Sequence, residues 1–363
     1  MSGNKNLMGW VWLAFFVFSL FLSFPAQARA AEVTIYQAPT GTLPCDLIYP
    51  GGQWLWYLDG ASYLVKMDLQ GPLSTTTFIL SPTTESVTKY HEAITMSGAV
   101  SINHTDTTLT PTTTNCSTSP WGMGFSAFPL DVSYYGSDFL ILHKDRLWWA
   151  ETGGLDGIYS FDPATGNITY WQLPPGSAPY RIRSDGKYLW FSEYNAGKVA
   201  RFDSATNQLR EWSVGGHPVI SDVDSNGRVW ITDGHNSGVL YLSQGTTADF
   251  IAFPNFPSFS INSNYGSWDI LQGPGDTRWL PIAELSTTHY GVIVRMNGYQ
   301  SYDYWYTPAH SEPWKLAMDS NKNVWFNFGY GTTVYMQLET FREVYDLSGH
   351  VVGGLSIDPM DNV

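Results

Sequence analysis

Residues able to carry out acid–base chemistry gather between positions 217 and 235. His217 precedes Pro218, and Asp233-Gly234-His235 follow an apolar run. Asp233 and His235 are two residues apart, so on a strand or its turn both side chains point to one side. A neutral imidazole removes protons near pH 7. We predict His217, Asp233 and His235 as catalytic residues; the alternative is that the histidines are polar surface residues of loops.

A second set of positions stands three places after the recurring tryptophans. In chain order they hold Asp59, Glu151, Glu193, Asp233, Ile282 and Phe328, and His104 holds the same position in a degenerate copy near Ser101. Carboxylates without cysteine favour Mg²⁺ or Ca²⁺ over transition metals. Glu151, Glu193 and Asp233 are therefore the predicted metal ligands. The alternative is that each acid bonds to local backbone or pairs with a neighbour such as Lys198. The chain has no glycine-rich phosphate loop, nucleophile elbow or His-Glu-x-x-His motif.

These residues are positioned by a repeated phrase: an aliphatic residue, a tryptophan and another apolar residue. The clearest copies are Leu55-Trp56-Tyr57, Leu147-Trp148-Trp149, Leu189-Trp190-Phe191, Val229-Trp230-Ile231 and Val324-Trp325-Phe326, with Arg278-Trp279-Leu280 as a weaker copy. From Trp148 onward the intervals are 42, 40, 49 and 46 residues. A fixed period in the forties, short strands and frequent turn residues predict a β-propeller.

The predicted fold is all-β, a seven-bladed propeller of four-stranded blades. Trp56 and Trp148 are 92 residues apart, which is two periods, so a degenerate second blade is expected near Ser101. Threonine- and serine-rich polar loops within 71–120 decorate that blade. The two termini are expected to close the ring, because closure removes exposed strand edges. One propeller domain spans 31–363.

The tryptophans of the repeated phrase are expected to pack between blades. Five lie off the repeated position and are freer to line a ligand surface: Trp149, Trp171, Trp212, Trp305 and Trp314.

Residues 1–30 are predicted to be a cleaved signal peptide. Lys5 precedes an apolar stretch that ends in Ala28-Arg29-Ala30, an Ala-x-Ala cleavage site. The mature chain contains no membrane span, and we expect it to be secreted or periplasmic and monomeric. An oxidising compartment permits a disulfide between Cys45 and Cys116. The formal charge of −14 excludes nucleic acid as a natural partner.

The segment from Leu189 to Asp203, with Pro179 before it and Arg210-Glu211-Trp212 after it, resembles the repeat of streptogramin B lyases. The resemblance implies a seven-bladed propeller whose channel mouth receives the residues three places after each tryptophan. It also implies a magnesium ion, a catalytic histidine in a Glu-Pro-His-Gly motif, and a glutamate three places after the last tryptophan. Here the motif reads Glu312-Pro313-Trp314-Lys315, and Phe328 replaces the glutamate.

The leading hypothesis is a lyase-like propeller that binds a small molecule, a glycan or a protein at its channel face without the family's elimination chemistry. The predicted ligand-binding residues are Asp59, His104, Glu151, Glu193, Glu312, Trp314 and Phe328. One alternative is a Mg²⁺- or Ca²⁺-dependent lyase or hydrolase acting on a cyclic ester, lactone or sugar. Another is a cell-envelope interaction protein.

Overall fold

The computed structural model describes residues 31–346 with gaps, and residues 1–30 and 347–363 lie outside the description. The gaps are 37–43, 51, 60–62, 73–74, 81–82, 117–118, 123–124, 131–139, 152–155, 225, 234–237, 244–246, 253–264, 285–290, 309–312, 329–332 and 338. All regular structure in the described residues is β-strand. Within these ranges no helix has the length and apolar character needed to cross a bilayer.

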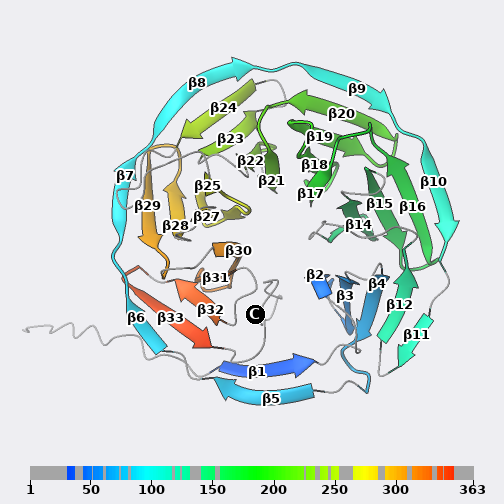
Figure 1. Ribbon diagram of the computed structural model, residues 1–363, viewed down its shortest axis with the longest axis horizontal. Coiled ribbons are helices and arrows are strands. Elements are labelled where there is room, and N and C mark those ends of the chain that lie inside the picture. Colours follow the sequence, from blue (N-terminus) through cyan, green and yellow to red (C-terminus); the bar gives the residue numbers. More distant parts are fainter. Residues whose placement is uncertain are drawn as a thin grey trace, which may run out of the picture.

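Five blades follow one another along the chain and are arranged around a common centre (Figure 1). The second blade comprises β13 (Ile141–His143), β14 (Arg146–Glu151), β15 (Gly157–Asp162) and β16 (Asn167–Gln172). The third comprises β17 (Pro179–Ser184), β18 (Leu189–Glu193), β19 (Lys198–Asp203) and β20 (Gln208–Ser213). The fourth comprises β21 (Pro218–Val223), β22 (Val229–Asp233), β23 (Gly238–Ser243) and β24 (Thr247–Ala252). The fifth comprises β25 (Tyr265–Gly266), β26 (Leu271–Gln272), β27 (Thr277–Glu284), β28 (Gly291–Asn297) and β29 (Ser301–Tyr306). The sixth comprises β30 (Pro313–Met318), β31 (Val324–Phe328), β32 (Thr333–Gln337) and β33 (Phe341–Asp346).

The first blade is split in sequence. Its inner strands are β2 (Pro44–Ile48), β3 (Trp54–Asp59) and β4 (Tyr63–Asp68). Its outer strands, β12 (Phe125–Pro129) and β11 (Ser119–Gly122), return more than fifty residues later.

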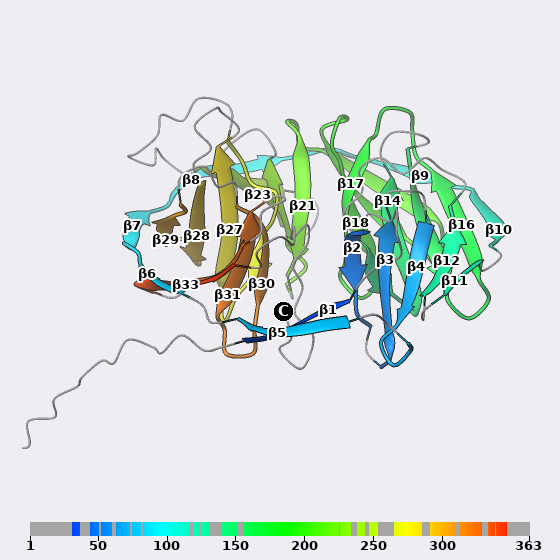
Figure 2. The same cartoon turned by 60° about the horizontal axis from the view of Figure 1, so that its bottom comes forward.

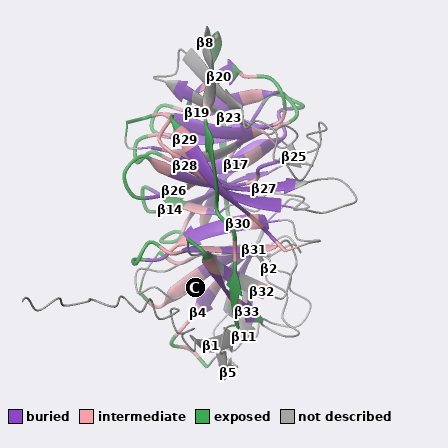
Figure 3. Cartoon of the chain, turned by 90° about the vertical axis from the view of Figure 1, so that its left-hand side faces the viewer, coloured by how far each residue is buried: buried purple, intermediate pink, exposed green. Residues whose placement is uncertain are grey.

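The intervening chain forms a belt, residues 83–116, around the outside of the blades (Figures 1 and 2). Its strands are β6 (Thr83–Ser86), β7 (Tyr90–Ala93), β8 (Thr95–Ser101), β9 (His104–Thr108) and β10 (Pro111–Asn115). They pair antiparallel with the outermost strands of the sixth, fifth, fourth, third and second blades, in that order. Figure 3 looks onto the side where exposed belt strands cross the ends of largely buried blades.

The belt corrects three predictions. Ser101 ends β8 and pairs with Thr247, so no blade forms around Ser101. The threonine- and serine-rich segment consists of edge strands rather than loops. The blade sheets have five strands, or six in the fifth blade, instead of four, and each of the second to sixth blades gains a belt strand.

The described residues thus form six blade sheets and one two-stranded sheet. In that small sheet β1 (Ala31–Tyr36) pairs with β5 (Thr75–Leu80), and Figure 1 places the pair between the sixth and first blades. Residues 347–363 lie outside the description, so ring closure by the two termini stays a prediction.

The core lies between neighbouring blades. One cluster joins Trp148 and Trp171 of the second blade to Phe191 and Phe202 of the third. Comparable clusters fill the first–second, third–fourth, fourth–fifth and fifth–sixth interfaces. Each blade is therefore stabilised by its neighbours, as expected for a repeat fold.

The repeated tryptophans are held at both ends. In three blades the indole Nε1 donates to an aspartate in the turn before the strand: Trp190 to Asp185 (2.8 Å), Trp230 to Asp224 (3.0 Å) and Trp325 to Asp319 (3.1 Å). In Trp148, Trp190 and Trp279 the ring also stacks on a tryptophan of the outer strand, as Trp190 does on Trp212 at 5.4 Å between centroids. The buried polar atom and the ring are both satisfied, which fixes the blade geometry.

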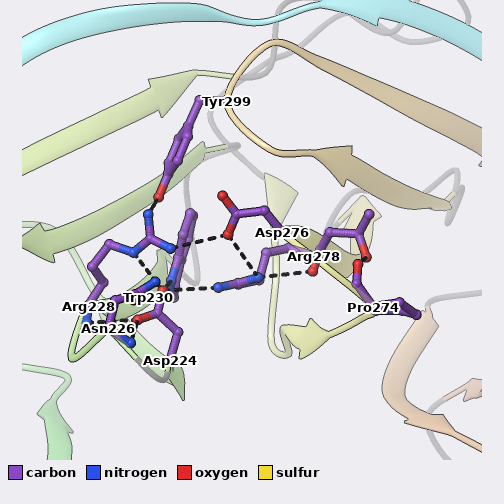
Figure 4. Close-up of polar contacts among 9 residues, drawn as sticks. Asp224, Asn226, Arg228, Trp230, Pro274, Asp276, Arg278 and Tyr299 are labelled. Carbon is purple, nitrogen blue, oxygen red and sulfur yellow. Dashed lines mark hydrogen bonds and ion pairs between the residues drawn. The ribbon is translucent and has the colours of Figure 1, made fainter.

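Asp224 extends this arrangement into a link between the fourth and fifth blades (Figure 4). Its carboxylate accepts from Arg228 Nε at 2.6 Å within its own blade and from Arg278 Nη2 of β27 at 3.0 Å. Arg278 is 1% exposed, and its guanidinium lies 4.7 Å from the centroid of the Trp230 ring. Burial alone would raise the pKa of Asp224, but hydrogen bonds from Trp230, from Arg228 and from the Asn226 backbone hold it below its usual value.

Candidate ligand-binding face

Proline starts the innermost strand in several blades and shapes the face on which these strands begin. A β-bulge follows Pro44 in β2, Pro179 in β17 and Pro313 in β30. Bulges interrupt the ladder and re-aim side chains. In β17 the bulge contains Tyr180 and Arg181, and in β30 it contains Trp314. We call this side of the molecule the binding face; β18, β22 and β31 end on it, because they run antiparallel to the innermost strands.

Five rings from four blades meet at this face in an aromatic cluster: Tyr180 and Tyr194 of the third blade, His217 of the fourth, Trp268 of the fifth and Trp314 of the sixth. All five are half-buried.

Three of the rings are nearly parallel. Trp268 and Trp314 have centroids 5.5 Å apart at an interplanar angle of 16°, and Tyr194 and Trp268 are 6.2 Å apart at 17°. Tyr180 meets Trp268 edge-on at 6.1 Å, and His217 lies 4.7 Å from Tyr194. Rings in direct contact leave no space for an ion between them, so the cluster presents a stepped platform rather than a cage.

A buried ion pair underlies the cluster. Arg181 of β17 is 2% exposed and donates to Asp269 Oδ1 and to the Trp268 carbonyl. Asp269 Oδ2 accepts from the backbone N–H of Leu316 in β30 at 3.1 Å. One carboxylate therefore connects the third, fifth and sixth blades and fixes the backbone beside Trp268.

Asp233 borders the cluster. It ends β22 and faces Pro218, the residue after His217. Its charge, together with burial, raises the pKa of Tyr194. His217 Nδ1 lies 3.3 Å from the Tyr194 carbonyl oxygen. His217 and Asp233 are thus near the same tyrosine, while His235 lies outside the described residues.

Glu151 is not on the open face. It is fully buried on the side of β14 that faces the first blade. Burial raises its pKa to about 7, an effect that Tyr159 offsets only in part.

Glu193 has the same relation to the second blade. It is fully buried, and burial together with the charge of Glu211 raises its pKa to about 8. Lys198 binds Glu211 at 2.8 Å and opposes this rise. Residues one and three places after the tryptophan share a strand face, and that face packs on the preceding blade. The expectation that Glu151 and Glu193 line the channel mouth is therefore wrong.

The predicted metal site does not form in the described residues. No group of three or more His, Cys, Asp or Glu side chains there is arranged to hold an ion. Glu151, Glu193 and Asp233 occupy three different interfaces between blades.

His104 is also misplaced by the sequence prediction. It begins β9 of the belt, opposite Trp212, and lies 3.8 Å from Asp106. The prediction failed because the segment is an edge strand rather than a blade.

The remaining predicted residues have mixed outcomes. Phe328 is half-buried at the end of β31, opposite Pro313, and packs on Phe326 and Tyr335. Glu312 and the side chain of Asp59 lie outside the described residues. Cys45 is on the innermost strand of the first blade and Cys116 follows the belt strand β10. The disulfide between Cys45 and Cys116 stays a prediction.

Four of the five tryptophans expected to line a ligand surface are core residues instead. Trp149, Trp171, Trp212 and Trp305 are at most 6% exposed and stack on neighbouring rings. Trp314 alone joins the binding face.

Sequence reasoning missed Tyr180, Tyr194, Trp268 and the Arg181–Asp269 pair. A signal existed for Tyr180, because it follows the proline of an innermost strand as Trp314 does. Tyr194 is four places after Trp190, next to the position that was compared between blades.

The fold is similar to that of solved streptogramin B lyases. A catalytically inactive histidine-to-alanine variant of virginiamycin B lyase from Staphylococcus aureus, with quinupristin, is 16% identical; the match covers 88% of this chain and 90% of that chain, with a TM-score of 0.62. A selenomethionine form of the S. aureus enzyme is 16% identical over 91% and 93% of the two chains, with a TM-score of 0.59. Comparison with protein-family models and with curated proteins gives no match. At this identity the likeness establishes a lyase-like propeller fold.

Proposed function

We propose that this protein binds a ring-bearing ligand on the aromatic cluster and does so without the elimination chemistry of the lyases. The observation that carries the proposal is the near-parallel arrangement of Tyr194, Trp268 and Trp314, contributed by three blades to one face. Stacking on aromatic faces is a large and specific source of binding energy.

The chemistry around the platform favours a ligand without negative charge. Arg181 is the buried cation beneath the rings, and its charge is paired with Asp269. Asp233 adds a carboxylate at the edge, and the chain as a whole carries a formal charge of −14. Electrostatic repulsion therefore opposes phosphates and carboxylates. Neutral glycans and neutral or cationic cyclic peptides satisfy both conditions.

The residues of this chain argue against the lyase reaction. Resemblance to the lyase motif places Trp314 at the position of the catalytic histidine, and an indole does not act as a base near pH 7. Phe328 occupies the position of the required glutamate. The alternative of a Mg²⁺- or Ca²⁺-dependent lyase or hydrolase predicts that either ion raises the melting temperature and that Mg²⁺ supports linearisation of a cyclic depsipeptide ester.

The proposal includes export of residues 31–363 after removal of the signal peptide, to the cell exterior or periplasm. The mass of the mature protein recovered from the producing cells tests this part directly.

Calorimetric titration tests the binding. The probes are chitohexaose, which is neutral, and quinupristin, which is cationic. We expect one of them to bind, Trp314→Ala to weaken binding at least tenfold, and Trp314→Phe to retain most of it. Tyr90→Ala removes an exposed belt aromatic and is the matched control. Absence of binding by both probes, or equal affinities for wild type and Trp314→Ala, contradicts the proposal.

A further inference from the structure

The belt contains a repeat of its own that the polar composition hides. One apolar residue follows each belt strand, and the five are Val87, Ile94, Ile102, Leu109 and Cys116. Their spacings are 7, 8, 7 and 7 residues. The residues around them are largely exposed threonine, serine, histidine and acidic side chains.

Each of these apolar residues contacts a different inter-blade core. Val87 packs on the fifth–sixth cluster, Ile94 on the fourth–fifth and Ile102 on the third–fourth. Leu109, which is 7% exposed, belongs to the second–third cluster, and Cys116 packs on the first–second. The belt therefore contributes one apolar residue to the outer end of each of five successive interfaces between blades.

Backbone hydrogen bonds repeat with the same register. The N–H groups of Val87 and Ile94 donate to Thr340 and Gln300 carbonyls, each at 2.9 Å. Those of Leu109 and Cys116 donate to Asn207 at 2.9 Å and Gly166 at 3.1 Å. All four acceptors lie in the turn that precedes the outermost strand of a blade, so one belt repeat spans one blade.

Polar contacts also attach the belt to the blades between these apolar residues. Lys89 Nζ lies 2.8 Å from Glu339 Oε2, and His91 Nδ1 lies 2.8 Å from Asp303 Oδ1. Arg210 of β20 donates to both oxygens of Asp106, at 2.6 and 2.9 Å. The Lys89–Glu339 and Arg210–Asp106 pairs are exposed, so they contribute less than the buried apolar residues, whereas Asp303 is buried beside His91.

We propose that the belt, residues 83–116, docks after the blades have folded and detaches as a unit before they unfold. The partners of the belt lie far ahead in the chain: Lys89 and Glu339 are 250 residues apart. The loop-closure entropy of such contacts is offset only when the outer strands already exist. Because the belt pairs with the third to sixth blades, it also holds together the blades that carry the aromatic cluster.

Hydrogen exchange of the whole protein tests this proposal. We expect the amides of Val87, Ile94, Leu109 and Cys116 to be protected and to exchange together, faster than those of β18 and β22. Leu109→Ala should accelerate exchange throughout the belt about tenfold and leave β18 and β22 unchanged. Thr110→Ala, at the exposed neighbouring position, is the matched control and should change neither.

A locked variant keeps the test decisive if Leu109→Ala fails to fold. Thr108 and Gln208 are direct partners across β9 and β20, a spacing that suits a disulfide. Oxidised Thr108→Cys/Gln208→Cys should slow proteolysis within the belt at least tenfold relative to its reduced form. Equal cleavage of both forms, belt exchange as slow as that of β18 and β22, or equal responses to Leu109→Ala and Thr110→Ala overturns the proposal.

Discussion

Asp233 packs its carboxylate against Gly216 so closely that a Cβ at Gly216 would overlap with Oδ2. Gly216 also has a φ of +61°, a conformation that residues with a Cβ rarely adopt. Gly216 thus sets the position of Asp233, the acid that borders the aromatic cluster. Gly216 lies just before β21, and Asp233 ends β22.

Substitution of Gly216 should therefore affect the binding face. Gly216→Ala must move Asp233 away from Tyr194 and should weaken ligand binding several-fold. Gly215→Ala is the matched control, because Gly215 has a φ of +78° and open space around the added Cβ. Both variants carry backbone strain of about 1 kcal/mol, so only the difference between them reports on Asp233. Similar affinities for the two variants would show that the position of Asp233 does not affect ligand binding.

The ion pair beneath the cluster should be important for stability. Asp269→Ala leaves Arg181 buried with its charge uncompensated, which we expect to lower the free energy of unfolding by about 3–5 kcal/mol. Asp106→Ala removes the partner of Arg210 in an exposed pair and should cost about 0–1 kcal/mol. Chemical denaturation of both variants measures the contrast. Equal losses would show that burial of the Arg181–Asp269 pair has no special weight.

Burial of Glu151 predicts a pH dependence of stability. The pKa of this carboxyl is about 7 in the folded protein and 4.5 in the unfolded chain. The folded state therefore binds the proton more tightly. With respect to this group, stability is then greatest below pH 4.5 and falls as the pH rises through 7, by about 3 kcal/mol.

The test compares melting temperatures at pH 5 and pH 8. Glu151→Gln cannot ionise, so it should reduce the loss of stability between these values and be more stable than wild type at pH 8. Glu85→Gln, on the exposed strand β6, is the control and should follow wild type. If Glu151→Gln loses as much stability as wild type between pH 5 and pH 8, ionisation of Glu151 does not cause the loss.

The sequence predicted the blades well because their signals are local. The phrase around Trp190 or Trp230 marks the second strand, and Asp185 or Asp224 precedes it by five or six residues to bond the indole. Each of these contacts is made within one blade, so the repeat alone contains the information.

The belt could not be recognised in the same way. Its strands are short and polar, and their partners lie 52 to 261 residues away. The run Thr107 to Thr114 therefore resembled a loop, and His104 was assigned to a blade. Only the recurrence of Val87, Ile94, Ile102 and Leu109 at intervals of seven or eight residues distinguishes the segment from a linker.

The candidate site was predicted in part. His217 and Trp314 belong to one aromatic cluster, joined through Tyr194 and Trp268, and Asp233 borders it. Glu151 and Glu193 turn into the interfaces between blades. The direction of a side chain depends on the strand face, and spacing from Trp148 or Trp190 does not specify which face is open. Trp268 was missed because it belongs to a connection between β25 and β26 without the repeated phrase.

The most direct test of the aromatic cluster as the ligand site is the indole ¹⁵N–¹H spectrum during titration with chitohexaose or quinupristin. Trp268→Phe and Trp314→Phe assign the two resonances. The Nε1 of Trp268 is buried with no hydrogen-bond partner in the described structure, whereas those of Trp190 and Trp230 bond to aspartates. The account predicts that the Trp268 and Trp314 resonances shift with the probe that binds and that those of Trp190 and Trp230 stay fixed. Binding that leaves Trp268 and Trp314 unshifted would contradict it.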